Sequence, residues 1–255
     1  MDKSKLNEIK LHDTLSDKYK NIRFKNKNGS YYNKIWSEKI LNKISKNFKN
    51  ILDYGCGVCS FYKYINSKYV DISYIGTDIS FSMINIGKKE FKNINLVVAD
   101  GEILPFKNNS FDLVIGRGIL HHLPNPEKGI KEISRILKNN QQIIFSEPNN
   151  NILLSIPRFI AKKITKHFTE THISFKRKEL IKMLKNNDFE IKSIENFGYF
   201  AFPFGLPDII SILRLMPLSF FKILIKIDNI LSKIPYIKTL SWHIIILAEK
   251  DTKTI

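Results

Sequence analysis

Short apolar runs recur through the middle of the chain, and each ends at a turn or an acidic residue. Segments of helical length separate these runs. An alternation of this kind predicts βαβ units in a mostly parallel sheet with right-handed crossovers. The predicted strands are Asn50–Asp53, Ser73–Asp78, Asn95–Asp100, Phe111–Gly116 and Gln141–Glu147, and the predicted helices between them include Ser60–Asn66, Ser80–Phe91 and Pro126–Leu137.

Both flanks of this core have a different pattern. Residues 1–48 are polar with helical spacing of the apolar positions, which predicts an N-terminal helical lid. Beyond Pro148, the pattern predicts a helix at Lys178–Asn187 and strands at Phe189–Phe197 and Trp242–Glu249. The intervening residues 198–241 are a helical insertion of unusual length. We therefore predict a single domain over residues 1–255, with its ligand-binding core at residues 49–150.

The composition, with 43% hydrophobic and 25% charged residues, is that of a folded chain. No uncharged apolar run approaches the roughly 20 residues of a membrane-spanning helix. The N-terminal segment MDKSKLNEIK lacks the apolar centre of a signal peptide. Two cysteines cannot build a disulfide framework. We therefore expect a cytoplasmic protein.

Positive charge is concentrated at the two ends of the sequence. The net charge of +17 divides into +8 for residues 1–50, +1 for residues 51–149 and +8 for residues 150–255. Basic flanks favour an anionic partner, although a chain rich in lysine, asparagine and isoleucine throughout also offers a compositional explanation. The segments Leu218–Pro235 and Ile152–Phe168 pair a lysine face with a broad apolar face. Such helices either lie peripherally on an anionic inner membrane face or cap an acceptor pocket with their lysines in water.

A glycine turn follows the first predicted strand, in the order Asp53-Tyr54-Gly55-Cys56-Gly57. Glycine lets a ligand approach the backbone N–H groups at the start of the next helix. The second and third strands end at Asp78 and Asp100, so three carboxylates are predicted to line one crevice. The dinucleotide pattern G-x-G-x-x-G is broken at Ser60. An acidic crevice suits a cationic cofactor such as S-adenosylmethionine better than a pyrophosphate.

Five segments together resemble the class I S-adenosylmethionine-dependent methyltransferases, in particular the small-molecule group. They are ILDYGCGVC (51–59), IGTDIS (75–80), VVADGEILPF (97–106), FDLVIGRGILHHLPNP (111–126) and IIFSEPN (143–149). The resemblance implies a Rossmann-like, doubly wound α/β fold with a mostly parallel seven-stranded sheet and an antiparallel last strand. One departure is Cys59, where the family usually has a third glycine.

The resemblance also implies which residues bind S-adenosylmethionine. The amino-acid end of the cofactor is expected at the glycine loop, the ribose at the second strand and the adenine at the third strand. By that correspondence the cofactor-binding residues are Asp53, Gly55 and Gly57, then Asp78 and Ile79, then Asp100, Gly101 and Glu102, with Arg117 approaching the methionine moiety through its backbone.

Candidate proton acceptors border the same crevice. His121 and His122 follow the fourth strand, and we favour His122 slightly as a general base; a packing role for both is the alternative. His172 is a second candidate; the alternative is that it is a solvated histidine on the surface. Glu147 ends the fifth strand, where it either orients the acceptor or caps a turn. Cys56 and Cys59 form a C-x-x-C without a second pair, so we predict no metal site.

The sequence thus predicts a methyltransferase that acts on an O, N or C nucleophile of a small, apolar or lipid-linked molecule. The HHL segment is also similar to wobble-uridine tRNA methyltransferases, which leaves RNA as an alternative. We do not expect a nucleic-acid partner, because no RNA-binding module is recognisable. A non-catalytic, cofactor-binding module at a membrane surface is the other alternative.

Overall fold

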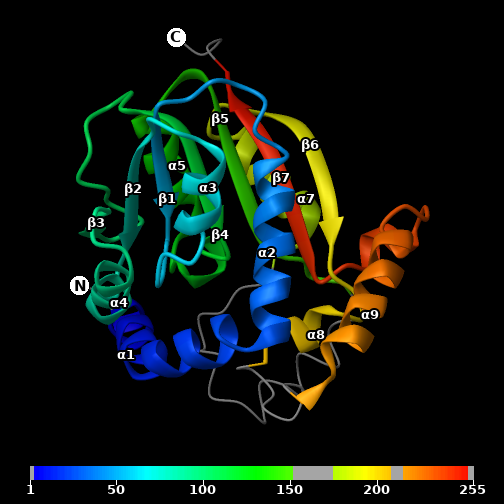
Figure 1. Cartoon of the computed structure of the whole chain (residues 1–255). Helices are drawn as coiled ribbons and strands as arrows, with labels where there is room; N and C mark the ends of the chain where they lie inside the picture. Colours follow the sequence, from blue (N-terminus) through cyan, green and yellow to red (C-terminus); the bar gives the residue numbers. More distant parts are fainter. Residues whose placement is uncertain (1–2, 152–174, 208–214, 252–255) are drawn as a thin grey trace.

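The computed structural model describes residues 3–151, 175–207 and 215–251 and contains one seven-stranded sheet (Figure 1). Its strand order is β3-β2-β1-β4-β5-β7-β6, and β7 is the antiparallel member. This is the predicted Rossmann-like, doubly wound fold. The strands are β1 (Asn50–Tyr54), β2 (Ser73–Asp78), β3 (Asn95–Val98), β4 (Phe111–Arg117), β5 (Leu137–Pro148), β6 (Phe189–Phe197) and β7 (His243–Lys250).

Helices cover both faces of the sheet because the central strands are apolar on both sides. One face packs against α2 (Lys27–Leu41), α3 (Tyr62–Lys68) and α4 (Phe81–Glu90), and α9 (Leu218–Leu231) joins the same apolar cluster by packing against α2. The other face packs against α5 (Pro126–Ile136) and α7 (Arg177–Lys185). In β1, for example, Ile51 belongs to the first apolar cluster and Leu52 to the second.

Local side-chain contacts fix where the helices next to the crevice begin. Ser80 caps α4 by accepting a hydrogen bond from the Met83 backbone N–H at 3.2 Å. Asn125 caps α5 in the same way, accepting from the Lys128 N–H at 3.1 Å, and Pro126 occupies the first turn. Predicted and observed boundaries differ most at β5, which begins at Leu137, where it pairs with Phe111 before a register shift.

The N-terminal residues and the insertion gather at the carboxyl end of the parallel strands, at the bottom of Figure 1. The N-terminal elements are α1 (Lys3–Lys18), the π-helix η1 (Tyr19–Phe24) and α2, and the insertion contributes α8 (Phe202–Gly205), α9 and η4 (Ile237–Leu240). Asp13 of α1 accepts a hydrogen bond from the Ser80 hydroxyl at 2.6 Å, which fastens α1 to the start of α4. The predicted helix within Ile152–Phe168 lies outside the described residues.

Candidate active site

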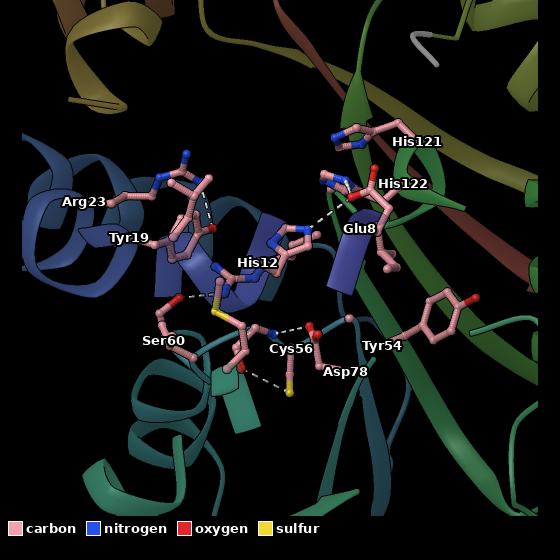
Figure 2. A pocket seen from close by; sticks show the side chains of 18 of the residues that line it. Glu8, His12, Tyr19, Arg23, Tyr54, Cys56, Ser60, Asp78, His121 and His122 are labelled. Atoms are coloured by element: carbon pink, nitrogen blue, oxygen red, sulfur yellow. Dashed lines mark hydrogen bonds and ion pairs between the residues drawn. The ribbon is translucent and has the colours of Figure 1, made fainter. Parts of the chain in front are cut away.

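A cavity of about 390 Å³ lies at the carboxyl ends of β1, β2 and β4, beneath the N-terminal helices (Figure 2). Its volume is in the range of small-molecule sites, roughly 300–1,000 Å³. Seven of the predicted cofactor-binding residues line it: Gly55, Gly57, Asp78, Ile79, Asp100, Gly101 and Arg117. Asp53 and Glu102 are buried but do not line it. His121 and His122 line it as well, whereas His172 lies outside the described residues.

The glycine loop has the left-handed backbone that its sequence predicts. Gly55 has φ of 70° and Gly57 has φ of 55°. A Cβ at Gly55 would meet Ile119 at 2.6 Å, so this position also has no room for a side chain. At Gly57 a Cβ would have no heavy atom within 4 Å, which leaves open space above the backbone on the cavity side of the loop. Gly57 therefore lets a ligand approach the main chain closely, whereas Gly55 makes room for Ile119.

Cys59 adopts the left-handed conformation that explains why glycine is usual in the family at this position. Its φ is 59°, in a region that costs a non-glycine residue about 1 kcal/mol or more. The side chain is completely buried, and its Sγ fills the space beside Gly87, where a Cβ would approach it to 2.6 Å. The Cys56 and Cys59 sulfurs lie 3.6 Å apart, and burial raises the pKa of the Cys56 thiol. A raised pKa disfavours the reactive thiolate.

Asp78 ties the second strand to the glycine loop. One carboxylate oxygen accepts a hydrogen bond from the Gly57 N–H at 2.9 Å, and the other accepts from the Ser80 N–H at 2.9 Å. Burial raises the pKa of Asp78, although nearby His12 and the backbone N–H groups act in the opposite direction. The carboxylate lines the cavity below α1, as Figure 2 shows.

Asp53 supports the site from behind the loop. Its Oδ2 accepts a hydrogen bond from the Tyr74 hydroxyl at 2.5 Å. Burial raises the pKa of Asp53, against the lowering effects of Arg117 and of the Tyr74 hydrogen bond. Asp53 thus lies behind the cavity wall and does not line the cavity, and it interacts electrostatically with Arg117, which does.

Lys5 closes the cavity at the third strand. Its Nζ lies 2.6 Å from Asp100 Oδ2 and 2.7 Å from Glu102 Oε2. Burial lowers the pKa of Lys5, but the hydrogen bonds to both carboxylates outweigh that effect and raise the pKa overall. The predicted adenine edge is therefore joined to α1. Sequence analysis missed Lys5, because one lysine in a polar helix carries no distinguishing signal.

The Arg117 side chain joins α2 to the glycine loop. Its guanidinium donates hydrogen bonds to Asn33 Oδ1 at 3.1 Å and to Ser60 Oγ at 3.0 Å. It also lies over the rings of Trp36 and Phe61, at 5.6 and 4.7 Å from their centroids. Arg117 also lines the cavity, and its approach to the methionine moiety through the backbone stays a prediction.

His121 and Glu147 form a buried pair. His121 Nδ1 lies 2.8 Å from Glu147 Oε2, and Glu147 Oε1 accepts the backbone N–H groups of Ile119 and Leu120 at 3.0 and 2.9 Å. Burial raises the pKa of Glu147 to about 8, although these hydrogen bonds lower it. A histidine whose Nδ1–H donates to a carboxylate presents Nε2 as the proton acceptor.

His122 has a different environment. Its Nδ1 lies 3.1 Å from Glu8 Oε2, and the same oxygen lies 3.4 Å from His12 Nε2. Burial, followed by the neighbouring His121, lowers the pKa of His122 to about 3, despite Glu8. So weak a base accepts a proton poorly near neutral pH. The lowered pKa of His122 and the contact of His121 with Glu147 lead us to favour His121 as the proton acceptor, in contrast to the slight preference from the sequence.

Glu8, His12 and His122 also form the one group of potential metal ligands found among the described residues. Their ligand atoms lie within 4.8 Å of one another, and Figure 2 shows Glu8 between the two imidazoles. Two histidines and a carboxylate are a donor set that zinc accepts. Here the carboxylate pairs with both rings, so hydrogen bonding alone explains the arrangement.

Several buried polar atoms at the cavity lack a hydrogen-bond partner among the described residues. They are Tyr32 Oη, Asn33 Nδ2, Thr77 Oγ1 and Arg117 Nε, and all four residues line the cavity. Buried polar atoms normally find a partner, so these atoms indicate a polar ligand. Together with the open backbone at Gly57 and the Asp78 carboxylate, they fit a nucleoside that carries an amino acid.

Several known proteins that are similar to this chain are methyltransferases. Residues 52–145 match the family described as "Methyltransferase domain". A Rickettsia prowazekii ubiquinone/menaquinone biosynthesis C-methyltransferase is 31% identical over 144 residues, which are 51% of this chain and 58% of that protein. A Saccharomyces cerevisiae tRNA (carboxymethyluridine(34)-5-O)-methyltransferase is 35% identical over 95 residues, which are 36% of this chain and 31% of that protein. An uncharacterized Methanocaldococcus jannaschii protein is 34% identical over 148 residues, 58% of this chain and 54% of that one.

The fold agrees with these matches. A crystal structure of an S-adenosylmethionine-dependent methyltransferase from Thermotoga maritima covers 95% of this chain and 99% of its own, with a TM-score of 0.67 and 17% identity. Residues 52–145 therefore match a methyltransferase domain, and the fold around them is that of a class I S-adenosylmethionine-dependent methyltransferase. The chain spans little more than half the length of these relatives: 54% of the archaeal protein and 58% of the rickettsial protein.

Proposed function

We propose that this chain transfers the methyl group of S-adenosylmethionine to a nucleophile of a small, apolar acceptor, with His121 as the general base. The observation that carries the proposal is that one cavity is lined both by the glycine loop with Asp78 and by His121, whose Nδ1 contacts buried Glu147 behind the cavity wall. A methyl donor at the loop and a proton acceptor at the fourth strand are then within reach of one acceptor molecule.

The part of the cavity nearest the insertion supports an apolar acceptor. Its lining there is largely aromatic and aliphatic, with Tyr32, Trp36, Phe202, Leu206 and Trp242. Apolar walls with a few placed polar atoms are typical of small-molecule pockets. The Tyr32 hydroxyl and His121 are two such polar groups. A quinone precursor or another lipid-linked ring would match this chemistry, and the rickettsial relative is named for such a substrate.

The contacts of each residue at the cavity suggest its role in the proposed reaction. Asp78 accepts hydrogen bonds from the ribose hydroxyls, while Gly55 and Gly57 admit the amino-acid end. Bound S-adenosylmethionine supplies an electrophilic methyl group. His121 accepts the acceptor's proton at Nε2. The ionised form of Glu147, which prevails above its pKa of about 8, holds the Nδ1–H tautomer and stabilises the imidazolium that results. Trp36 and α1 exclude water from the reacting atoms.

The first experiment is product detection. Purified chain is incubated with isotopically labelled S-adenosylmethionine and a panel of demethylquinones and polyketide-like phenols, with total tRNA as a parallel substrate. We expect labelled methyl in the lipid-soluble fraction and formation of S-adenosylhomocysteine. Label in tRNA would favour the RNA alternative that the yeast relative suggests. Binding of the cofactor without product from either class would favour a non-catalytic module.

A further inference from the structure

Helix α9 has an apolar stripe on the side that faces away from the protein. Its inner face is fixed in the core by Phe221 and Ile225, which are 0% and 7% exposed. Buried Asp228 accepts hydrogen bonds from the backbone N–H groups of Tyr199, Phe200 and Ala201 at 2.8 to 3.2 Å. Because both anchors fix the rotation of the helix, the outward stripe is a defined surface.

The stripe consists of five large apolar side chains at i, i+3, i+4 spacing. They are Phe220, Ile223, Ile227, Ile230 and Ile234, with exposed fractions of 53%, 51%, 38%, 61% and 38%; Tyr236 beyond them is 88% exposed. Single exposed apolar residues are ordinary, but a contiguous row of this kind marks an interaction surface.

Exposed lysines accompany the stripe. Lys222, Lys226, Lys233 and Lys238 are all exposed. The sole acidic residue between positions 215 and 241 is Asp228, which is buried and occupied by backbone N–H groups. The exposed charges of residues 215–241 are therefore all positive. No helix among the described residues is long and apolar enough to cross a bilayer.

We infer that this surface, the α9 stripe with its four lysines, docks onto an anionic lipid bilayer. An apolar row inserts at the headgroup–acyl boundary, and flanking lysines bind the acidic headgroups. Pairing of two copies through the stripe fits less well, because a two-fold axis would bring like-charged lysines together without carboxylates to pair them.

The docking surface lies next to the cavity. Phe221 on the inner face of α9 packs against Tyr31 and Tyr32 of α2, with ring centroids 6.4 and 6.2 Å apart. Tyr32 lines the cavity, and Figure 1 shows α8 and α9 at the same end of the sheet. Docking would thus present the cavity end of the molecule to the bilayer, which could supply an apolar acceptor. Only this supply of an acceptor from the lipid rests on the proposed function.

Co-sedimentation of the full chain with vesicles tests the inference. Vesicles of phosphatidylcholine alone are compared with vesicles containing about one third phosphatidylglycerol. We expect binding only to the anionic vesicles, and weaker binding in about 0.5 M NaCl, where the Debye length falls below about 5 Å.

Two variants with matched controls separate the stripe from general charge. The triple variant I223S/I227S/I230S and the double variant K226E/K233E should each weaken binding at least tenfold. The controls are V70S, which removes another exposed apolar side chain, and K128E/K131E, which makes the same charge change on α5; both should bind as the unaltered chain does.

Three results would overturn the inference: no sedimentation with anionic vesicles, equal losses in variants and controls, or a dimer in solution that the triple variant dissociates. Calorimetric binding of S-adenosylhomocysteine is measured on every variant. Normal cofactor binding with lost vesicle binding locates the defect at the surface. If the unaltered chain does not bind S-adenosylhomocysteine, the proposed function is contradicted. The vesicle result would still test membrane docking, because docking does not depend on cofactor binding.

Discussion

Glu147 Oε2 lies 2.8 Å from His121 Nδ1, and Glu147 Oε1 accepts two backbone N–H groups from the turn that carries this histidine. One fully buried carboxyl group therefore sets the position of the imidazole that faces the cavity, and its ionised form, above a pKa of about 8, sets the Nδ1–H tautomer. In the proposed reaction, His121 is the base and Glu147 is its positioning residue.

The substitution Glu147→Gln tests this relationship. The amide oxygen would still accept the two backbone N–H groups, so the amide nitrogen must donate to His121 Nδ1 and shift the ring proton to Nε2. At about pH 9, where Glu147 of the unaltered chain is ionised, we expect kcat to fall about 100-fold with little change in the KM for S-adenosylmethionine, close to the loss of roughly 10² or more for His121→Gln. The ¹⁵N chemical shifts of the His121 ring would report the tautomer. An unchanged tautomer, or an unchanged kcat, would contradict the assignment.

The raised pKa of Glu147 also predicts a dependence of stability on pH. Between the ordinary value near 4.5 and about 8, the folded protein keeps a proton that the unfolded chain releases. The folded state binds more protons there, so this group lowers the free energy of unfolding as pH rises through that window. Urea titrations at pH 5, 6, 7 and 8 should show a smaller decline for Glu147→Gln than for the unaltered chain. Parallel curves for the two proteins would show that Glu147 ionises normally.

Cys59 offers a test of backbone strain at the cofactor loop. Cys59→Ala removes a buried sulfur and keeps the unfavourable φ of 59°, whereas Cys59→Gly removes more atoms but relieves the strain. We expect the glycine variant to be more stable than the alanine variant by about 1 kcal/mol. The midpoints of chemical unfolding give the comparison. If the alanine variant is the more stable, packing against Gly87 contributes more to stability at this position than the backbone conformation does.

Lys5 is expected to control how fast the cofactor leaves. Lys5→Met breaks both ion pairs of α1 with the third-strand edge. Because these pairs hold α1 over the cavity, dissociation of S-adenosylhomocysteine should become several-fold to about tenfold faster, in line with loss of roughly 1 kcal/mol. Lys10→Met, on the exposed side of the same helix, is the control. Stopped-flow displacement measures both rates, and equal rates would show that α1 does not retain the ligand.

The fold could be predicted from the sequence because strand and helix signals alternate clearly between Asn50 and Glu147. The antiparallel β7 followed from family resemblance, since an apolar run such as Trp242–Glu249 does not state its direction. The strand-end aspartates could also be found, because the carboxyl ends of parallel strands meet at one edge. Side-chain packing places Asp53 behind the cavity wall and Asp78 at the cavity. The spacing of the aspartates along the sequence does not reveal this difference.

The roles of the two adjacent histidines could not be predicted for a similar reason. His121 and His122 share a turn, but one ring meets Glu147 from β5 and the other meets Glu8 from α1. Both partners are far away in the sequence. Lys5 and Glu8 were missed together, because the docking of α1 over the crevice depends on tertiary contacts such as Asp13 with Ser80.

Calorimetric titration with S-adenosylhomocysteine most directly tests whether the cavity is a methyl-donor site. The unaltered chain should bind one equivalent, and Asp78→Ala should bind at least tenfold more weakly. Asp112→Ala is the matched control, because Asp112 likewise accepts two backbone N–H groups, from Lys49 and Asn50 at 3.0 and 2.8 Å, but at the start of β1, away from the cavity. Its affinity should equal that of the unaltered chain. Absence of binding by the unaltered chain, or equal affinity in Asp78→Ala, would contradict the assignment of this cavity.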